Sequence, residues 1–197
     1  MRAIVALCVV GVAAPLALSA CVTARDPIVT TAAPVRAGNW VVDRQIDRIT
    51  GAPLSLAYVV TRNSSYSSVA FTHPARMELG CFRQQPIVRF VFSYKVGSNR
   101  NSMLSYRFDD RPGRETQARF LHLTRMVVIE DEDAAAQFLR ELAASKTLYI
   151  LIRSLNAGRS SAEFNVEGAS AAIEQALAEC SPKGAGKSRR AEARRAN

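Results

Sequence analysis

The sequence has little of what most metal sites and hydrolase active sites require. It contains two histidines, His73 and His122, and four cysteines, and none of them lie at the short spacing of a zinc site. Neither the G-x-S-x-G pattern of esterases nor the H-E-x-x-H pattern of metalloproteases occurs. The stretch GAGKSRR fails as a phosphate loop because Ser181 stands at the position of the first glycine. The sequence therefore predicts no catalytic residues, no metal and no cofactor.

The body of the chain also lacks a strong charge of one sign. The net charge is +9, of which residues 181–197 supply +5 and Arg2 supplies +1, so only +3 remains for the body. A nearly balanced domain argues against nucleic acid as a partner. The basic tail, residues 181–197, has no apolar periodicity and is predicted to be disordered. It either adheres to an anionic surface or serves as a solubilising tail without a specific partner.

An apolar leader occupies residues 1–20. Arg2 provides a positive start, and the residues from Ala3 to Leu18 carry no charge. Gly11 and Pro15 interrupt this run, which is too short for a comfortable membrane span. The pattern is typical of a secretory signal peptide that is cleaved after a small residue.

The leader ends in LSAC, residues 18–21, which resembles the lipobox of bacterial lipoproteins. The resemblance implies a diacylglyceryl group on Cys21, cleavage before it and acylation of the new amino terminus, which together make a stable membrane anchor. Val22 resembles the sorting signal of outer-membrane cargo, so we expect a periplasmic protein on the outer rather than the inner membrane of a Gram-negative bacterium. The alternatives are a secreted protein with a plain thiol at Cys21, or an uncleaved apolar anchor.

Two cysteines remain after the leader and the lipidation site are set aside. Cys81 and Cys180 both fall on apolar faces of their predicted elements. An exported protein enters an oxidising compartment, and an even remainder of two cysteines predicts one disulfide. The alternative is a pair of buried thiols that never meet.

The domain organisation follows from shifts in composition and periodicity. Residues 21–39 are small, polar and proline-containing, as expected of a lipidated tether, and residues 40–180 form the domain. Strands are predicted at 54–60, 75–82, 86–96, 102–110, 121–129, 147–154 and 160–167, and helices at 130–146 and 168–180. Segments 86–96 and 102–110 are expected to form one hairpin, as are 147–154 and 160–167. We therefore predict an α+β domain with an antiparallel sheet of about six strands and two helices, one of them joined to the sheet by the disulfide.

Three arginines fall opposite the inward-facing residues of their strands. If the strands share one sheet, Arg89, Arg107 and Arg153 line its outer face. Such a face could bind anions, such as peptidoglycan carboxylates, lipid phosphates or an acidic protein. The alternative is a solvated sheet surface whose arginine stems cover apolar atoms.

The region from Trp40 to Cys180 resembles the TagO/VasI-like periplasmic proteins associated with type VI secretion. The resemblance is carried by Cys81 late in a strand, by YRFDD at 106–110, by FNVEG at 164–168, by the helix with Phe138 and Leu142, and by the closing helix with Cys180. It implies a two-cysteine periplasmic domain without catalytic residues. The lipobox and the basic tail of this chain depart from that pattern.

These observations predict a lipid-anchored envelope protein that is not an enzyme. It would have a binding or structural role, with an envelope protein or an anionic envelope polymer as its partner, as an accessory to a secretion or envelope assembly. The alternative is an envelope-surface hydrolase with an unrecognised active site, in which His73 would act as the base beside a nucleophile from the 61–74 loop.

Overall fold

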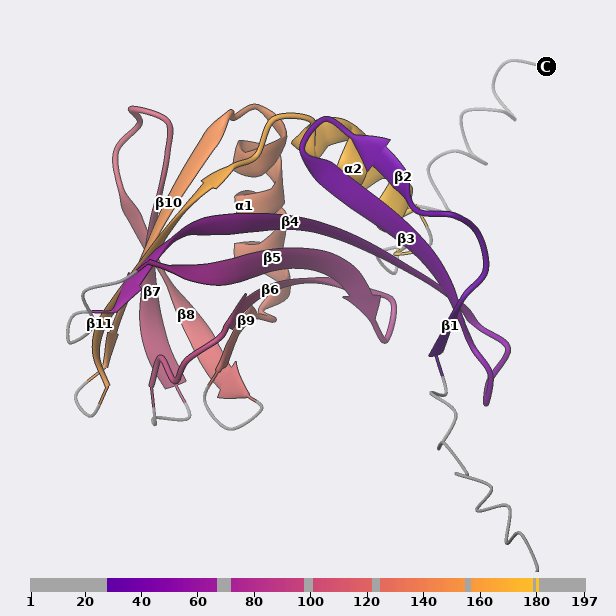
Figure 1. The fold of residues 1–197 in the computed structure, drawn as a ribbon, viewed down its shortest axis with the longest axis horizontal. Helices are drawn as coiled ribbons and strands as arrows, with labels where there is room; N and C mark the ends of the chain where they lie inside the picture. Colours follow the sequence, from indigo (N-terminus) through magenta and orange to yellow (C-terminus); the bar gives the residue numbers. More distant parts are fainter. Residues whose placement is uncertain are drawn as a thin grey trace, which may run out of the picture.

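The computed structural model describes residues 28–66, 72–97, 101–121, 125–154, 157–178 and 180, and in them most residues belong to strands (Figure 1). In chain order the elements are β1 (Ile28–Thr30), β2 (Val35–Ala37), β3 (Trp40–Asp47), β4 (Pro53–Tyr66), β5 (His73–Phe82), β6 (Gln85–Phe92), β7 (Asn101–Phe108), β8 (Arg114–Leu121), β9 (Met126–Ile129), α1 (Glu132–Ala143), β10 (Thr147–Ser154), β11 (Gly158–Asn165) and α2 (Ala169–Ala176). The predicted lipidation site at Cys21, the predicted leader and the basic tail lie outside the described residues.

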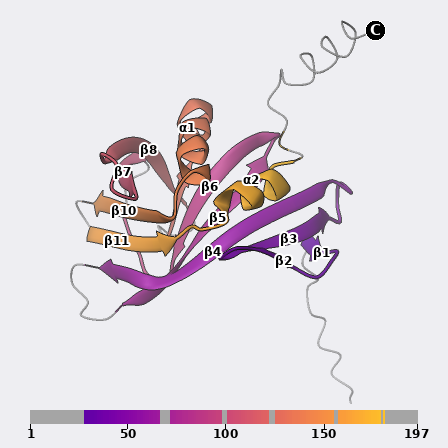
Figure 2. The same cartoon turned by 90° about the horizontal axis from the view of Figure 1, so that it is seen from above.

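Eight of the strands close into an antiparallel barrel. Their order is β4-β11-β10-β7-β8-β9-β6-β5, and β5 pairs again with β4 to complete the circle. The strands β1, β2 and β3 extend the sheet beyond β4 (Figure 2). The prediction of an α+β fold with an open sheet of about six strands is therefore wrong, although two helices are present in the described residues.

Two features of the sequence concealed the barrel. The strand β8 reads RETQARFL and buries only Ala118 and Phe120, so its apolar alternation is too short to predict a strand. The expected hairpin between 86–96 and 102–110 does not form, because β6 pairs with β5 and β9 while β7 pairs with β8 and β10. Period-2 alternation identifies the buried face of a strand but not the strand beside it.

The barrel interior is filled by side chains from the alternating positions of its strands. Phe90, Phe108 and Phe164 are fully buried there, as the alternation predicted. The helix α1 adds Phe138, whose ring packs at 5.0 to 6.0 Å from those of Tyr106, Phe108 and Phe90. Large side chains fill the interior of a small barrel and leave no space for a ligand. Binding surfaces are therefore expected on the outer wall.

The amino-terminal strands are fastened to the carboxy-terminal helix. The buried indole of Trp40 donates a 3.1 Å hydrogen bond to the Val166 carbonyl. Gly168 has φ of 90°, and a Cβ there would lie 2.3 Å from the Ala37 carbonyl oxygen, so glycine is required by both conformation and space. Residues 28–37, which we assigned to the tether, thus contribute β1 and β2 to the sheet.

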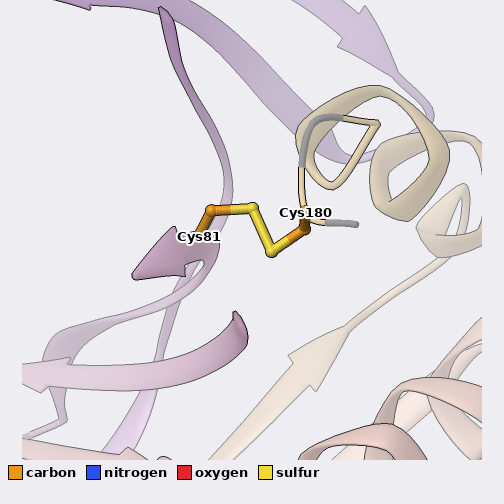
Figure 3. Close-up of a disulfide and its surroundings, with 2 residues drawn as sticks. All are labelled: Cys81 and Cys180. Atoms are coloured by element: carbon orange, nitrogen blue, oxygen red, sulfur yellow. A yellow bond between two sulfur atoms is a disulfide. The ribbon is translucent and has the colours of Figure 1, made fainter. Parts of the chain in front are cut away.

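The disulfide predicted between Cys81 and Cys180 is confirmed (Figure 3). It joins the end of β5 to the segment that follows α2, with the two Cα atoms 5.6 Å apart. The two cysteines are 99 positions apart in the sequence, so the bond links the barrel wall to the end of the described domain. It holds α2 and the β5–β6 turn in a fixed relation.

We predict that the double substitution Cys81→Ser, Cys180→Ser lowers the free energy of unfolding by about 4–5 kcal/mol, because a loop of this size loses its constraint in the unfolded chain. Urea unfolding of the variant and of the oxidised protein measures the difference. Reduced wild-type protein is the control, and it should unfold at the midpoint of the variant. An unchanged midpoint in both would show that the bond does not stabilise the fold.

Candidate functional site: the outer wall of the barrel

The barrel separates the three arginines that were expected to share one surface. Arg107 on β7 and Arg153 on β10 lie on adjacent strands, whereas β8 and β9 stand between β7 and β6, which carries Arg89. All three side chains point away from the core. Closure of the sheet therefore brings Arg107 and Arg153 together and turns Arg89 toward another side of the molecule.

Arg89 is engaged by a carboxylate that the outer wall almost buries. The side chain of Glu78 on β5 is only 4% exposed, and it forms ion pairs with Arg76 on its own strand and, at 3.0 Å, with Arg89 on β6. The Arg76 guanidinium lies over the ring of Tyr58, 5.3 Å from its centre. This cluster ties β4, β5 and β6 together and leaves Arg89 little capacity for an external anion.

Arg107 and Arg153 line a groove of about 330 Å³ that we call the Tyr149 groove. Its lining includes Arg107, Arg114, Glu115, Tyr149 and Arg153. The Arg107 guanidinium stacks on the Tyr149 ring, 4.8 Å from its centre, and among the described residues no carboxylate pairs with it. Arg153 lies 3.7 Å from Glu115, and Arg114 lies 2.9 Å from Glu141. Two of the three arginines in this groove are therefore already partly neutralised.

A larger groove of about 440 Å³ lies over the β5–β6 turn, and we call it the Phe82 groove. Its lining includes Phe82, Arg83, Ile87, Arg119, Val128 and Glu130. The Phe82 side chain is 58% exposed, although an aromatic of this size is normally buried. Ile87 and Val128 point out of the barrel and give the groove an apolar floor, which is the composition of a docking surface and not of a solvated strand face.

The turn that presents Phe82 is made of residues that disfavour its conformation. Arg83 has φ of 52° and Gln84 has φ of 66°, so a two-residue hairpin turn is built without glycine or asparagine. Left-handed backbone costs about 1–2 kcal/mol for such residues and persists only where the surroundings enforce it. The disulfide at Cys81, next to Phe82, and the pairing of Phe82 with Gln85 provide that enforcement.

Opposite charges balance around the Phe82 groove. Arg83 lies over the Phe82 ring at 5.2 Å, and Arg119 pairs with Glu130 at 2.5 Å. Asp131, at the same rim, accepts a 2.9 Å hydrogen bond from the Ala134 N–H and caps α1. A rim of mixed charge with an exposed aromatic resembles a protein interface more than an anion site.

Sequence reasoning passed over Phe82 although a signal was present. Met77, Leu79 and Cys81 alternate toward the core, so the next residue had to face outward. An aromatic residue at an outward position, followed by RQQ in place of a glycine-containing turn, marks an unusual strand end. The size of the groove itself depends on β8 and β9 lying beside β6, which the sequence does not reveal.

His73 does not form a catalytic pair with Ser64, and residues 67–71 of the same loop lie outside the described residues. The buried hydroxyl of Ser64 donates its hydrogen bond to the backbone carbonyl of His73 and not to the imidazole. The His73 ring instead packs edge-on against Tyr94, with the ring centres 5.3 Å apart. Burial raises the pKa of the Tyr94 hydroxyl, which donates to the Ser65 carbonyl at 3.0 Å. These contacts join the ends of strands at this end of the barrel.

The described residues hold neither a candidate metal cluster nor a membrane-spanning helix. They contain no group of three or more His, Cys, Asp or Glu side chains arranged to hold a metal ion. None of their helices is long and apolar enough to cross a membrane.

We predict that Glu78→Gln lowers the free energy of unfolding by about 2–3 kcal/mol. The substitution replaces the buried carboxylate by a neutral amide, so Arg76 and Arg89 lose their negative partner. The matched control is Glu130→Gln, which breaks the Arg119 pair where both side chains are nearly half exposed, and which should cost under about 1 kcal/mol. Urea unfolding of the two variants measures both costs. Equal costs would refute a structural role for the buried cluster.

Comparison of the chain with protein-family models, curated proteins and solved structures finds no match. The resemblance to TagO/VasI-like domains accordingly stays a prediction.

Proposed function

We propose that this chain is a lipid-anchored cell-envelope protein with a non-catalytic binding role, in which the Phe82 groove docks an envelope protein. The exposed aromatic over an apolar floor is the observation that carries the proposal. Membership of a secretion or other envelope assembly would give such a docking surface its purpose.

The disulfide supports the choice of compartment. Disulfides persist in the periplasm and are rare in the reducing cytosol, so the Cys81–Cys180 bond agrees with an exported protein. The leader and lipobox of the sequence supply the export route and the anchor. With two or three acyl chains on Cys21, membrane attachment would be stable, whereas a single chain binds reversibly.

The chemistry of the Phe82 groove supports a protein as the partner. Aromatic and arginine side chains dominate the binding energy of protein interfaces, and Arg83 stacks on Phe82 in the same turn. The neighbouring charges, Arg119 with Glu130, form a polar rim that can exclude water from the apolar floor. An anionic polymer would gain less here, because acidic residues line the same groove.

We predict that protein from its native cell begins at Cys21 and carries lipid there, as measured by the intact mass. Cys21→Ser should abolish lipidation. The variant should then either be absent from the detergent-extracted membrane fraction or keep its leader uncleaved. The matched control is Cys8→Ser, which changes a cysteine within the leader and should leave the mature mass unaltered. A bare thiol at Cys21 in the wild-type protein would contradict the proposed anchor.

We further predict that a photo-crosslinking phenylalanine analogue at position 82, in the full chain expressed in its native cell, yields a discrete protein adduct. The same analogue at Val60, which is 55% exposed on β4 and outside the Phe82 groove, should yield none. Phe82→Ala should weaken co-purification of the adduct's partner by more than about tenfold, the loss of roughly 1.4 kcal/mol or more expected of an interface hot spot.

Binding of purified peptidoglycan or lipopolysaccharide separates the two candidate surfaces. Loss of such binding in the double variant Arg107→Ala, Arg153→Ala, with normal behaviour of Phe82→Ala in every assay, would assign the function to the Tyr149 groove. The partner would then be an anionic polymer and the proposed protein-docking role would be wrong.

A further inference from the structure

Exposed apolar side chains concentrate at one end of the amino-terminal strands. Eight large hydrophobic residues are exposed in the described part of the chain, and five of them belong to β1, β2, β3 or the turn after β3. Four gather where β1 pairs with the end of β3, and we call them the β1–β3 patch: Ile28, Val29, Ile46 and Ile49. Val29 and Ile46 are cross-strand partners, so their side chains lie on the same face, whereas Ile28 shares the opposite face of this strand end with its partner Asp47.

The most exposed of these residues is held out by an ordered turn. Ile49 is 82% exposed at the tip between β3 and β4. The Asp47 carboxylate accepts the N–H of Ile49 at 2.8 Å and the hydroxyl of Thr50 at 2.9 Å, and these bonds lower the pKa of Asp47. Gly51 supplies the left-handed residue, with φ of 71°. These hydrogen bonds fix the turn in a conformation that exposes the Ile49 side chain.

Arginines border the patch. Arg44 is exposed two positions before Ile46 on β3, and therefore on the same face of the strand, and Arg48 is exposed next to Ile49. The negative charge of Asp47 is directed into its own turn by the hydrogen bonds above. Apolar side chains bordered by exposed arginines are the composition of a surface that enters the headgroup region of an anionic bilayer.

The position of the patch in the chain identifies the occupant. Only seven positions separate Ile28, where β1 begins, from Cys21, and seven residues span at most about 25 Å. The β3–β4 turn lies beside β1 at the lower right of Figure 1. A lipid on Cys21 would therefore keep the patch within reach of the bilayer at all times.

We propose that the β1–β3 patch docks onto the bilayer that holds the Cys21 lipid, with Ile49 inserted at the level of the headgroups and upper acyl chains. This inference rests on the proposed lipid anchor. It adds that the domain is not suspended freely from a tether but has a fixed orientation, with its amino-terminal strands toward the membrane and the barrel farther out.

The experiment uses tryptophan fluorescence of the mature chain on vesicles of phosphatidylethanolamine and phosphatidylglycerol. The native Trp40 is fully buried, so the wild-type protein gives the background. Ile49→Trp should show a blue shift and strong quenching when the acyl chains carry bromine. The matched control is Met103→Trp, at a position that is 45% exposed on β7 and away from the patch, and it should show neither change.

Each outcome decides the inference. Quenching of Trp at position 49 alone supports it, whereas no quenching in vesicle-bound protein, or equal quenching at 49 and 103, overturns it. A blue shift at position 49 that requires high protein concentration and no vesicles would identify a second copy of the chain as the occupant and also overturn it. The intact mass tests the anchor separately. If Cys21 proves bare, the same measurement on protein coupled at Cys21 to a maleimide lipid still tests the docking.

Discussion

The architecture depends on the long strand β4, which pairs with three other strands: β3, β5 and β11. Along one edge, β4 pairs with β3 through residues 53–58 and then with β11 through residues 64–66, while its other edge is occupied by β5. The register with β5 shifts between Thr61 and Ser64, which bends the strand at the point where β3 is exchanged for β11. Without this exchange β3 would occupy the whole of one edge of β4, and β11 could not pair there. The sheet would then stay open.

Closure of the sheet also decides where binding can occur. The inward positions and Phe138 of α1 fill the barrel, so recognition is left to the wall. On the wall the strand order determines which side chains meet: β7 beside β10 unites Arg107 with Tyr149, and β9 beside β6 forms the floor under Phe82. The disulfide then links the β5–β6 hairpin, which carries Phe82, to Cys180 at the end of the described domain. The two grooves are thus consequences of topology.

The candidate site was only partly predictable from the sequence. The pairing of Cys81 with Cys180 followed from elimination and from the apolar faces on which both cysteines lie. The outward direction of Arg89, Arg107 and Arg153 followed from period-2 alternation. Their common surface did not, because a closed sheet turns its outer face through a full circle, and Arg89 in addition has a buried carboxylate partner on the neighbouring strand.

By itself the sequence determined the local properties of this protein. It fixed the buried faces of β6, β7, β10 and β11, the apolar stripe of α1 and the hairpin from β10 to β11, since each depends on residues a few positions apart. Only the tertiary structure decided the closed barrel, the incorporation of residues 28–37 into the sheet and the exposure of Phe82 and Ile49. These features arise from pairings between strands far apart in the chain, such as β4 with β11, whose free energy depends on the whole set of contacts and leaves no short-range pattern in the sequence.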